Sequence, residues 1–458
     1  MANCCICFAM RFSQTPLTRP PSELRRKIGP QFQADIEARR ASFDSPEIGP
    51  TLRAMTELAE LGLSLPDLAK MRHYRRGRIM AELRKHRLGG MLLFDPINIR
   101  YATDSMNMQV WTLHNLARAA FISSEGYIVL WDFVHCEHMT KHLPLINEVR
   151  SGAGAFYFEH GAEEASQGSK FAQEIKDVMA QHGCEGRIAI DRMDIAISQS
   201  FQDKNIYYVP GQPIMEQARL IKGPDEIKAM KCAAAACELA VKKMHEALEP
   251  GLAEVELWAV LHHENIARGG EWIETRILSS GPRTNPWMQE AGPRIIKDGE
   301  LLAFDTDLIG LYGMCCDMSR TWLVGDGNGT AEQKDCYQIA YDHINENTTL
   351  LKPGISFNEL TFKGHVLPEA FQDQKYCVKM HGVGLCDEYP SIYYEDHFIE
   401  GAFEGELQPG MTLCVEAYIG KVGGIDGVKL ENQILITEDG YENLTPYPYE
   451  ERLLYHAH

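Results

Sequence analysis

The feature that most constrains this chain is a set of acidic residues that interrupt apolar, strand-like segments in its second half. Asp305 and Asp307 lie in LLAFDTDLIG, and Asp317 follows ten residues later, in a segment typical of the returning arm of a hairpin. Glu416 interrupts the apolar run MTLCVEAYIG, and Glu431 interrupts VKLENQILIT. A buried carboxylate is costly unless it is paired or bound to a cation, so these acids predict a shared cationic partner.

One histidine completes the set, because His381 lies in the glycine-flanked segment KMHGVGL. Asp305 and Asp307 are two residues apart, so both side chains would leave one face of a strand. Five carboxylates and one imidazole need about two divalent cations, and oxygen-rich ligation with one His favours iron, manganese or cobalt. Cys315 and Cys316 keep zinc open, although neighbouring residues on a strand point to opposite faces.

Composition excludes several classes of protein. The 458 residues carry a formal net charge of −19, which repels phosphate, so neither nucleic acid nor a membrane surface is expected as a partner. No apolar run reaches the roughly 18 residues of a transmembrane helix. The apolar start MANCCICFAM lacks the basic residues and cleavage site of a signal peptide. Thirteen scattered cysteines favour a reducing cytoplasm over a disulfide framework.

The chain is long enough for two domains. Residues 1–65 are rich in Pro, Arg and Ser and predict an N-terminal arm. Helices alternating with short strands over 66–215, interrupted by a turn at DPINIRYAT, predict a smaller α/β domain. A long helix that begins at Pro224 opens the second domain, 216–458. The expected fold class is α/β (α+β) with two domains.

Together these segments resemble the pita-bread metallopeptidases, which include methionine aminopeptidases, Xaa-Pro peptidases and creatinases. The resemblance starts at Arg219 and is carried by RLIKGPDEIKAMK, SSGPRTNP, FDTD, DMSRTW, HGVGL, VEAYI and LENQILIT. From about Met71 the chain also resembles the smaller creatinase domain. The resemblance implies a creatinase-like N-terminal domain and a C-terminal pita-bread domain. The metal ligands that it implies are Asp305, Asp307, Asp317, His381, Glu416 and Glu431.

Three departures from the peptidases affect the expected function. The peptidases carry accessory histidines at three positions where this chain has Trp287, Cys377 and Glu388. Peptide hydrolysis needs such donors to stabilise an oxyanion. An Xaa-Pro or methionine aminopeptidase with a divergent pocket and a non-catalytic binding protein stay as alternatives.

The same combination is similar to one offshoot, the dimethylsulfoniopropionate lyases built on the pita-bread fold (the DddP type). That group shares the additional Asp307, an Asp after the metal histidine (Asp387) and a Tyr before it (Tyr376). The resemblance implies two iron ions, a homodimer and a small-molecule sulfonium substrate.

Such a lyase cleaves dimethylsulfoniopropionate to dimethyl sulfide and acrylate by β-elimination. Two metal ions would bind the substrate carboxylate as Lewis acids, and one base would remove the neighbouring proton. Asp387 is the candidate base, and its alternative role is to cap a turn. Tyr376 and Trp287 are candidate substrate-binding residues, Trp287 through a cation–π contact with the sulfonium. Each of these two could instead be an ordinary packing residue.

Overall fold

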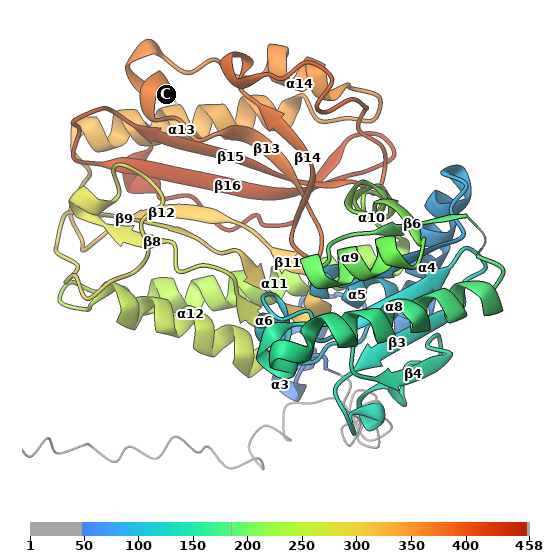
Figure 1. Cartoon of the computed structure of the whole chain (residues 1–458). Coiled ribbons are helices and arrows are strands. Elements are labelled where there is room, and N and C mark those ends of the chain that lie inside the picture. Colours follow the sequence, from blue (N-terminus) through green and yellow to red (C-terminus); the bar gives the residue numbers. More distant parts are fainter. Residues whose placement is uncertain (1–47, 185, 456–458) are drawn as a thin grey trace, which may run out of the picture. The chain divides into compact units, whose positions relative to one another are not determined.

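The computed structural model describes residues 48–184 and 186–455, and Figure 1 traces them in chain order. Most of the expected N-terminal arm, residues 1–47, lies outside the described residues. Within the rest of that segment, helix α3 (Leu52–Glu60) buries Ala54, Met55 and Leu58. Its first turn is capped by Thr51, whose side chain accepts a hydrogen bond from the Ala54 amide. No helix in the described ranges has the length and apolar character needed to cross a membrane.

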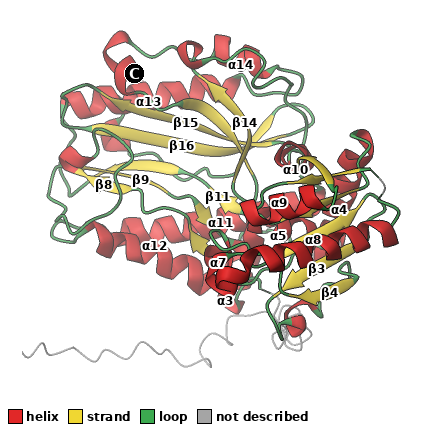
Figure 2. Ribbon diagram, viewed as in Figure 1, coloured by secondary structure: helices red, strands yellow, loops and turns green. Residues whose placement is uncertain are grey.

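The N-terminal part is a six-stranded mixed sheet with helices against it (Figure 2). The strand order is β4-β3-β2-β1-β5-β6, with β1 antiparallel to β2 and parallel to β5. The strands are β1 (Gly90–Leu93), β2 (Ala119–Ser123), β3 (Ile128–Asp132), β4 (Glu148–Ser151), β5 (Arg187–Ile190) and β6 (Tyr207–Pro210). The helices are α4 (Leu68–Lys85), α5 (Pro96–Thr103), α6 (Gln109–Thr112), α7 (Tyr157–His160), α8 (Glu164–Gln181), α9 (Ile195–Asp203) and α10 (Gln212–Arg219).

The prediction of a turn at DPINIRYAT is wrong, because residues Pro96–Thr103 of this segment form helix α5. Asp95 caps the helix by accepting hydrogen bonds from the Ile97 amide at 2.8 Å and the Asn98 amide at 3.3 Å. Pro96 occupies the first helical position, where its missing N–H has no intrahelical partner to lose. The Asp95-Pro96 pair therefore begins a helix and not a turn.

The C-terminal part begins with α11 (Pro224–Ala247), the long helix expected from Pro224, followed by α12 (Glu254–Arg268). A five-stranded sheet has the order β14-β13-β15-β16-β17, and two three-stranded sheets have the orders β12-β9-β8 and β11-β10-β7. The strands are β7 (Trp272–Ile273), β8 (Leu278–Ser280), β9 (Leu301–Asp305), β10 (Leu308–Ile309), β11 (Cys315–Cys316), β12 (Ser319–Leu323), β13 (Val378–Val383), β14 (Asp387–Tyr393), β15 (Thr412–Gly420), β16 (Gly427–Ile436) and β17 (Tyr441–Asn443). The remaining helices are α13 (Ala331–Thr349) and α14 (Phe357–Lys363).

These sheets bring the acidic segments together. Helix α13 packs on β15 and β16, while α11 packs near β11 and α12 near β8 (Figure 1). Strands β12 and β16 contact each other between these helical layers. The register pairs Glu416 with Glu431, and Ser319 with Asp305. Side chains on both strand pairs can therefore enter one buried space.

The expectation that Asp305 and Asp307 leave one strand face needs correction. Strand β9 ends at Asp305, and Asp307 lies before β10 with a φ of 36°. This left-handed conformation is uncommon for a residue with a side chain. A turn, rather than strand alternation, therefore orients the Asp307 carboxylate.

Candidate metal centre

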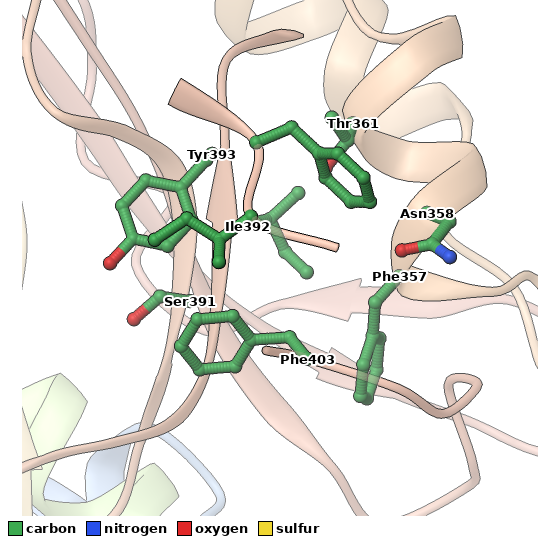
Figure 3. Close-up of a pocket in the computed structure, with 9 residues that line it drawn as sticks. Phe357, Asn358, Thr361, Ser391, Ile392, Tyr393 and Phe403 are labelled. Atoms are coloured by element: carbon green, nitrogen blue, oxygen red, sulfur yellow. The ribbon is translucent and has the colours of Figure 1, made fainter. Parts of the chain in front are cut away.

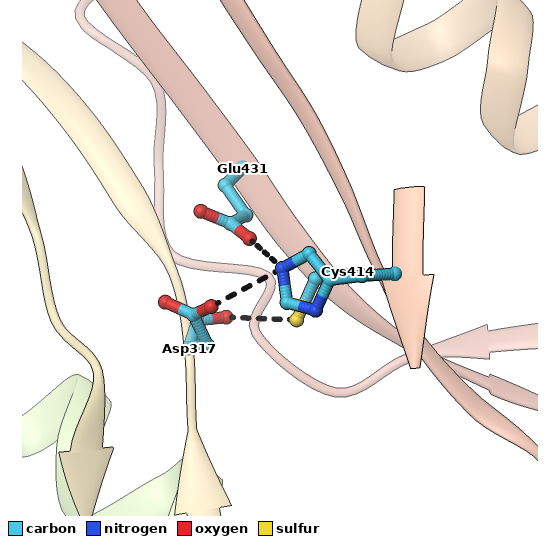
Figure 4. A group of neighbouring side chains, drawn as sticks. Asp317, Cys414 and Glu431 are labelled. Carbon is cyan, nitrogen blue, oxygen red and sulfur yellow. Dashed lines mark hydrogen bonds and ion pairs between the residues drawn. The ribbon is translucent and has the colours of Figure 1, made fainter. Parts of the chain in front are cut away.

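His381, in β13, lies at the middle of the predicted ligand set. Its Nε2 atom is 3.6 Å from Oδ2 of Asp317, 3.5 Å from Oε1 of Glu416 and 3.5 Å from Oε1 of Glu431. Figure 4 labels Asp317, Glu431 and Cys414, which each offer a ligand atom within 4.8 Å of His381. The hairpin and strand assignments of the sequence analysis therefore bring four of the six predicted ligands into direct proximity.

Asp305 joins the cluster through a buried lysine that sequence reasoning missed. The Lys429 ammonium is 2.8 Å from Oδ2 of Asp305, 2.9 Å from Oε2 of Glu416 and 2.8 Å from Oε2 of Glu431. The Ser319 hydroxyl lies 2.7 Å from Oδ1 of Asp305 and 2.8 Å from Oε2 of Glu431, and its one proton is shared between them. Protein donors thus hold both oxygens of Asp305 and the Oε2 atoms of the two glutamates, whose Oε1 atoms face His381.

Asp307 and Asp387 form the open side of the centre. Oxygen atoms of Asp307, Asp317 and Asp387 lie within 4.8 Å of one another, close enough to share an ion. The Thr275 hydroxyl donates a hydrogen bond to Asp307 at 2.9 Å. Asp387 lies 3.6 Å from Nδ1 of His381, and its side chain is 55% exposed. The predicted base therefore borders the ligand set from the solvent side.

The buried carboxylates of the predicted ligand set have shifted pKa values, because the protein supplies too little positive charge to neutralise all of them. Burial, followed by repulsion from neighbouring acids, raises the pKa of Asp307 to about 8. Burial also raises the pKa of Glu416 to about 8, although Lys429 opposes the shift. Glu431 differs, because Lys429 and His381 outweigh its burial and hold its pKa well below the usual range. A buried acid that keeps its proton near neutral pH can exchange that proton for a metal ion.

The donor set therefore fits divalent metal ions. Among the described residues, Oε1 of Glu416 and Oε1 of Glu431 accept no hydrogen bond, and both face His381. Five carboxylates with one imidazole match cations that prefer oxygen ligands and tolerate nitrogen. Cys414 also lies within 4.8 Å of Asp317, His381 and Glu431. No signal in the sequence marks Cys414 as a ligand, because a cysteine within an apolar run is typical of packing.

Cys315 and Cys316 do not enter this set together. Cys315 packs with Ile309 and Cys414, whereas Cys316 belongs to the separate core under α11. The alternation expected for adjacent strand residues is therefore present.

The two predicted substrate-binding residues lie beside Lys429. The Lys429 ammonium is 5.6 Å from the ring centre of Trp287 and 5.1 Å from that of Tyr376. Trp287 stacks on Tyr418 at 5.6 Å, and only 8% of its surface is exposed. Burial and the charge of Glu416 raise the pKa of Tyr376, so its hydroxyl stays protonated. These rings form an aromatic wall beside the ligands; their contact with a substrate stays a prediction.

None of the three positions that replace the peptidase histidines carries an imidazole, although the buried Trp287 indole N–H is a donor without a partner among the described residues. Trp287 is buried in the aromatic wall, and Cys377 is an exposed free thiol. Glu388 is buried and accepts from Lys222 at 3.0 Å, outside the metal-ligand set. Burial would raise its pKa, but Lys222 and Arg219 outweigh this effect and hold it below the usual value.

A separate hollow lies between α14 and β14 (Figure 3). Its lining includes the aromatic residues Phe357, Tyr393 and Phe403, and it contains none of the predicted site residues.

Comparison with known proteins agrees with this geometry. Residues 228–438 match metallopeptidase family M24. The Xaa-Pro dipeptidase of Bacillus anthracis superimposes with a TM-score of 0.66 at 22% identity, covering 82% of this chain and 98% of that one. The prolidase of Pyrococcus horikoshii gives 0.64 at 22% identity, covering 82% and 99%. Fold and site therefore define a two-domain pita-bread protein of the metallopeptidase type, which confirms the predicted fold class.

Closer relatives narrow the family. The dimethylsulfoniopropionate lyase DddP of Roseovarius nubinhibens is 48% identical over 436 residues, which cover 94% of this chain and 98% of that relative. The corresponding lyase of Roseobacter denitrificans is 45% identical over the same coverage. The chain belongs to the family of the dimethylsulfoniopropionate lyases DddP.

Proposed function

We propose that this protein cleaves dimethylsulfoniopropionate to dimethyl sulfide and acrylate by β-elimination. Membership of the lyase family supports the substrate. The observation that carries the reaction type is the position of Asp387, half-exposed and 3.6 Å from a predicted metal ligand, His381. A base so placed can reach a substrate at the open side of the centre without being a ligand itself.

The proposed reaction needs one proton transfer at an Asp387 carboxylate oxygen. Asp387 removes the proton from the carbon next to the substrate carboxylate, and that electron pair forms the carbon–carbon double bond. The carbon–sulfur bond breaks, and the sulfur keeps its electrons and leaves as neutral dimethyl sulfide. Bound metal ions would supply Lewis-acid stabilisation of negative charge on the substrate carboxylate. Partial desolvation beside the centre, together with repulsion from Glu431, raises the pKa of Asp387 above the usual value in the absence of metal ions, which makes its carboxylate a stronger base.

Each surrounding residue has a role in this proposal. Asp305, Asp307, Asp317, His381, Glu416 and Glu431 would hold two divalent ions, with iron as the expected metal and manganese, cobalt or zinc as alternatives. Trp287 would meet the sulfonium by a cation–π contact, and Tyr376 would contact the carboxylate or the sulfonium. We further propose a cytoplasmic homodimer that binds neither nucleic acid nor membranes, in keeping with the net charge of −19.

The experiment that tests this function compares two substrates. Metal-loaded protein is incubated with dimethylsulfoniopropionate and, separately, with an Xaa-Pro dipeptide. We expect headspace gas chromatography to detect dimethyl sulfide, with matching acrylate by liquid chromatography, and no free amino acid from the dipeptide. Free amino acid without dimethyl sulfide would identify a peptidase, and no product in either arm would favour a binding protein.

A further inference from the structure

The segment that carries Asp387 is fixed by an ion-pair cluster outside the metal centre. Asp387 begins strand β14, and Glu388 follows it with a side chain that is only 1% exposed, against 55% for Asp387. Successive strand residues point to opposite faces. The Glu388 side chain therefore extends away from the predicted metal centre, toward the segment that joins α10 to α11.

The Glu388 carboxylate accepts hydrogen bonds from two partners and forms an ion pair with a third. Lys222 lies 3.0 Å from Oε2, and Arg219 lies 3.1 Å from Oε1. The backbone amide of Leu385 donates to Oε1 at 3.1 Å. This last bond closes the hairpin Leu385–Glu388 on itself, so one carboxylate ties the hairpin to both cations.

The hairpin has little room to adopt another conformation. A side chain at Gly384 would collide with both carboxylate oxygens of Glu388. Tyr389, the residue after Glu388, donates a hydrogen bond from its backbone amide to the Glu216 carboxylate at 3.0 Å. Glu216 also forms an ion pair with Arg219 at 2.7 Å. The backbone around Asp387 is therefore held by two acids that share one arginine.

The cluster also reaches the N-terminal sheet. Arg219 donates to the Asn98 side chain of α5, and Asn98 donates to Asp191 at 3.0 Å, next to β5. The position of Asp387 thus depends on groups from both parts of the protein. Separating the members of a buried ion pair leaves an uncompensated charge, which is strongly unfavourable. The cluster therefore has one strongly preferred arrangement.

We propose that Glu388 is a positioning residue for the lyase reaction, and that Arg219 and Lys222 hold it so that Asp387 stays at the open side of the metal centre. This inference rests on the proposed function for its kinetic consequence, but the fixed hairpin can be measured without turnover. It also assigns a role to the position where the peptidases carry their third accessory histidine.

The kinetic test uses Glu388→Gln and Lys222→Met, with Lys222→Arg as the conservative variant. Glu226→Gln is the matched control, because Glu226 also pairs with a buried arginine, Arg75, at 2.7 Å but has no bond to the Asp387 hairpin. A displacement of about 1 Å in a reacting group can cost about 10²-fold. We expect Glu388→Gln and Lys222→Met to lower kcat by about 10- to 100-fold, with KM within about threefold and metal content unchanged.

A second readout is the reactivity of Cys386, a half-buried free thiol within the hairpin whose Sγ lies 3.1 Å from the Asp387 carbonyl. Alkylation by iodoacetamide, followed by peptide mass spectrometry, gives its rate relative to the exposed Cys377. We expect about tenfold faster labelling of Cys386 in Glu388→Gln and Lys222→Met, because a loosened hairpin opens more often. Lys222→Arg and Glu226→Gln should label like the unmodified protein.

The outcomes separate this proposal from the proposed function. Unmodified protein that releases no dimethyl sulfide would defeat the lyase assignment, while the labelling rates would still decide whether Glu388 fixes the hairpin. Unchanged Cys386 labelling in both Glu388→Gln and Lys222→Met would overturn the positioning role. Loss of metal together with kcat in those variants would also overturn it, since that pattern belongs to general damage of the centre. If Glu388→Gln does not fold, Lys222→Met and Lys222→Arg carry the comparison.

Discussion

Removing the metal ions should make the folding stability of this protein fall as the pH rises. In the metal-free centre, Asp307 and Glu416 hold their protons to a pKa of about 8 in each case. The ordinary values are 3.8 for Asp and 4.5 for Glu. A folded-state pKa raised above the unfolded one means that the folded state binds more protons between those values. The stabilisation is therefore fully present below about pH 4 and is lost as the pH approaches 8.

The magnitude follows from proton linkage. Each group that keeps its proton only in the folded state costs about 1.4 kcal/mol of stability per pH unit. Between pH 5.5 and 7.5 this amounts to about 3 kcal/mol for one group. The two acids belong to one buried acidic cluster, so their titrations are coupled and together they give less than twice that value. For 458 residues the unfolding entropy is about 1 kcal/mol/K, so a loss of about 3 kcal/mol should lower the melting midpoint by about 3 °C.

The assay is differential scanning calorimetry of chelated and metal-loaded protein across this pH range. Metal ions bind the deprotonated carboxylates, so the loaded protein should lack this fall, and the difference between the two samples isolates the centre from other titrating groups. Chelated Asp307→Asn should show a shallower pH dependence than the chelated unmodified protein, because one of the two acids is gone. A chelated protein whose midpoint stays level or rises with pH would refute the reasoning.

Five further results are expected. Asp387→Asn should keep its metal, measured by elemental analysis, while dimethyl sulfide release falls by about 10²–10⁴-fold; near-normal release would place the base elsewhere. The rate of the unmodified protein should rise with pH as Asp387 ionises, and the Asn variant should lose this limb. Glu431→Ala should lose metal and activity together, and full metal content would remove Glu431 from the ligand set. Trp287→Leu should raise KM for the sulfonium substrate more than it lowers kcat. The expected rise in KM is about two- to tenfold, because a cation–π contact contributes about 0.5–1 kcal/mol or more. An unchanged KM would leave Trp287 a packing residue. Light scattering should give twice the chain mass of 51.7 kDa, and a clean monomer would contradict the proposed dimer.

The sequence carried enough information to locate the acidic centre but not to orient all of it. Glu416 and Glu431 stand out because each interrupts an apolar strand, and their cross-strand pairing follows from the hairpin. Asp307 was assigned to the right region for the wrong reason, since a left-handed turn and not strand periodicity directs it. Lys429 was missed although it lies two residues before Glu431 and therefore on the same face of β16. A basic residue in an otherwise apolar strand was the signal that could have revealed it.

Glu388 shows a different limit of sequence reasoning. Comparison with the peptidases identifies it as a replaced histidine, which suggests a lost donor at the active site. Its partners, Arg219 and Lys222, lie more than 160 residues earlier in the chain, and only the folded structure brings them together. A substitution that removes a catalytic group in one reaction can thus supply a structural tether in another.

Lys429 also changes the charge balance on which the proposed metal content rests. Five ligand carboxylates carry five negative charges when all are ionised, and His381 is neutral when it binds a metal. Lys429, within 2.8–2.9 Å of three of these carboxylates, cancels one of them. The four charges that remain equal those of two divalent ions, which agrees with the proposed dinuclear centre. In the proposed mechanism the ions bind the six ligands and not Asp387, so this carboxylate lies outside the charge balance and would be free to accept the substrate proton.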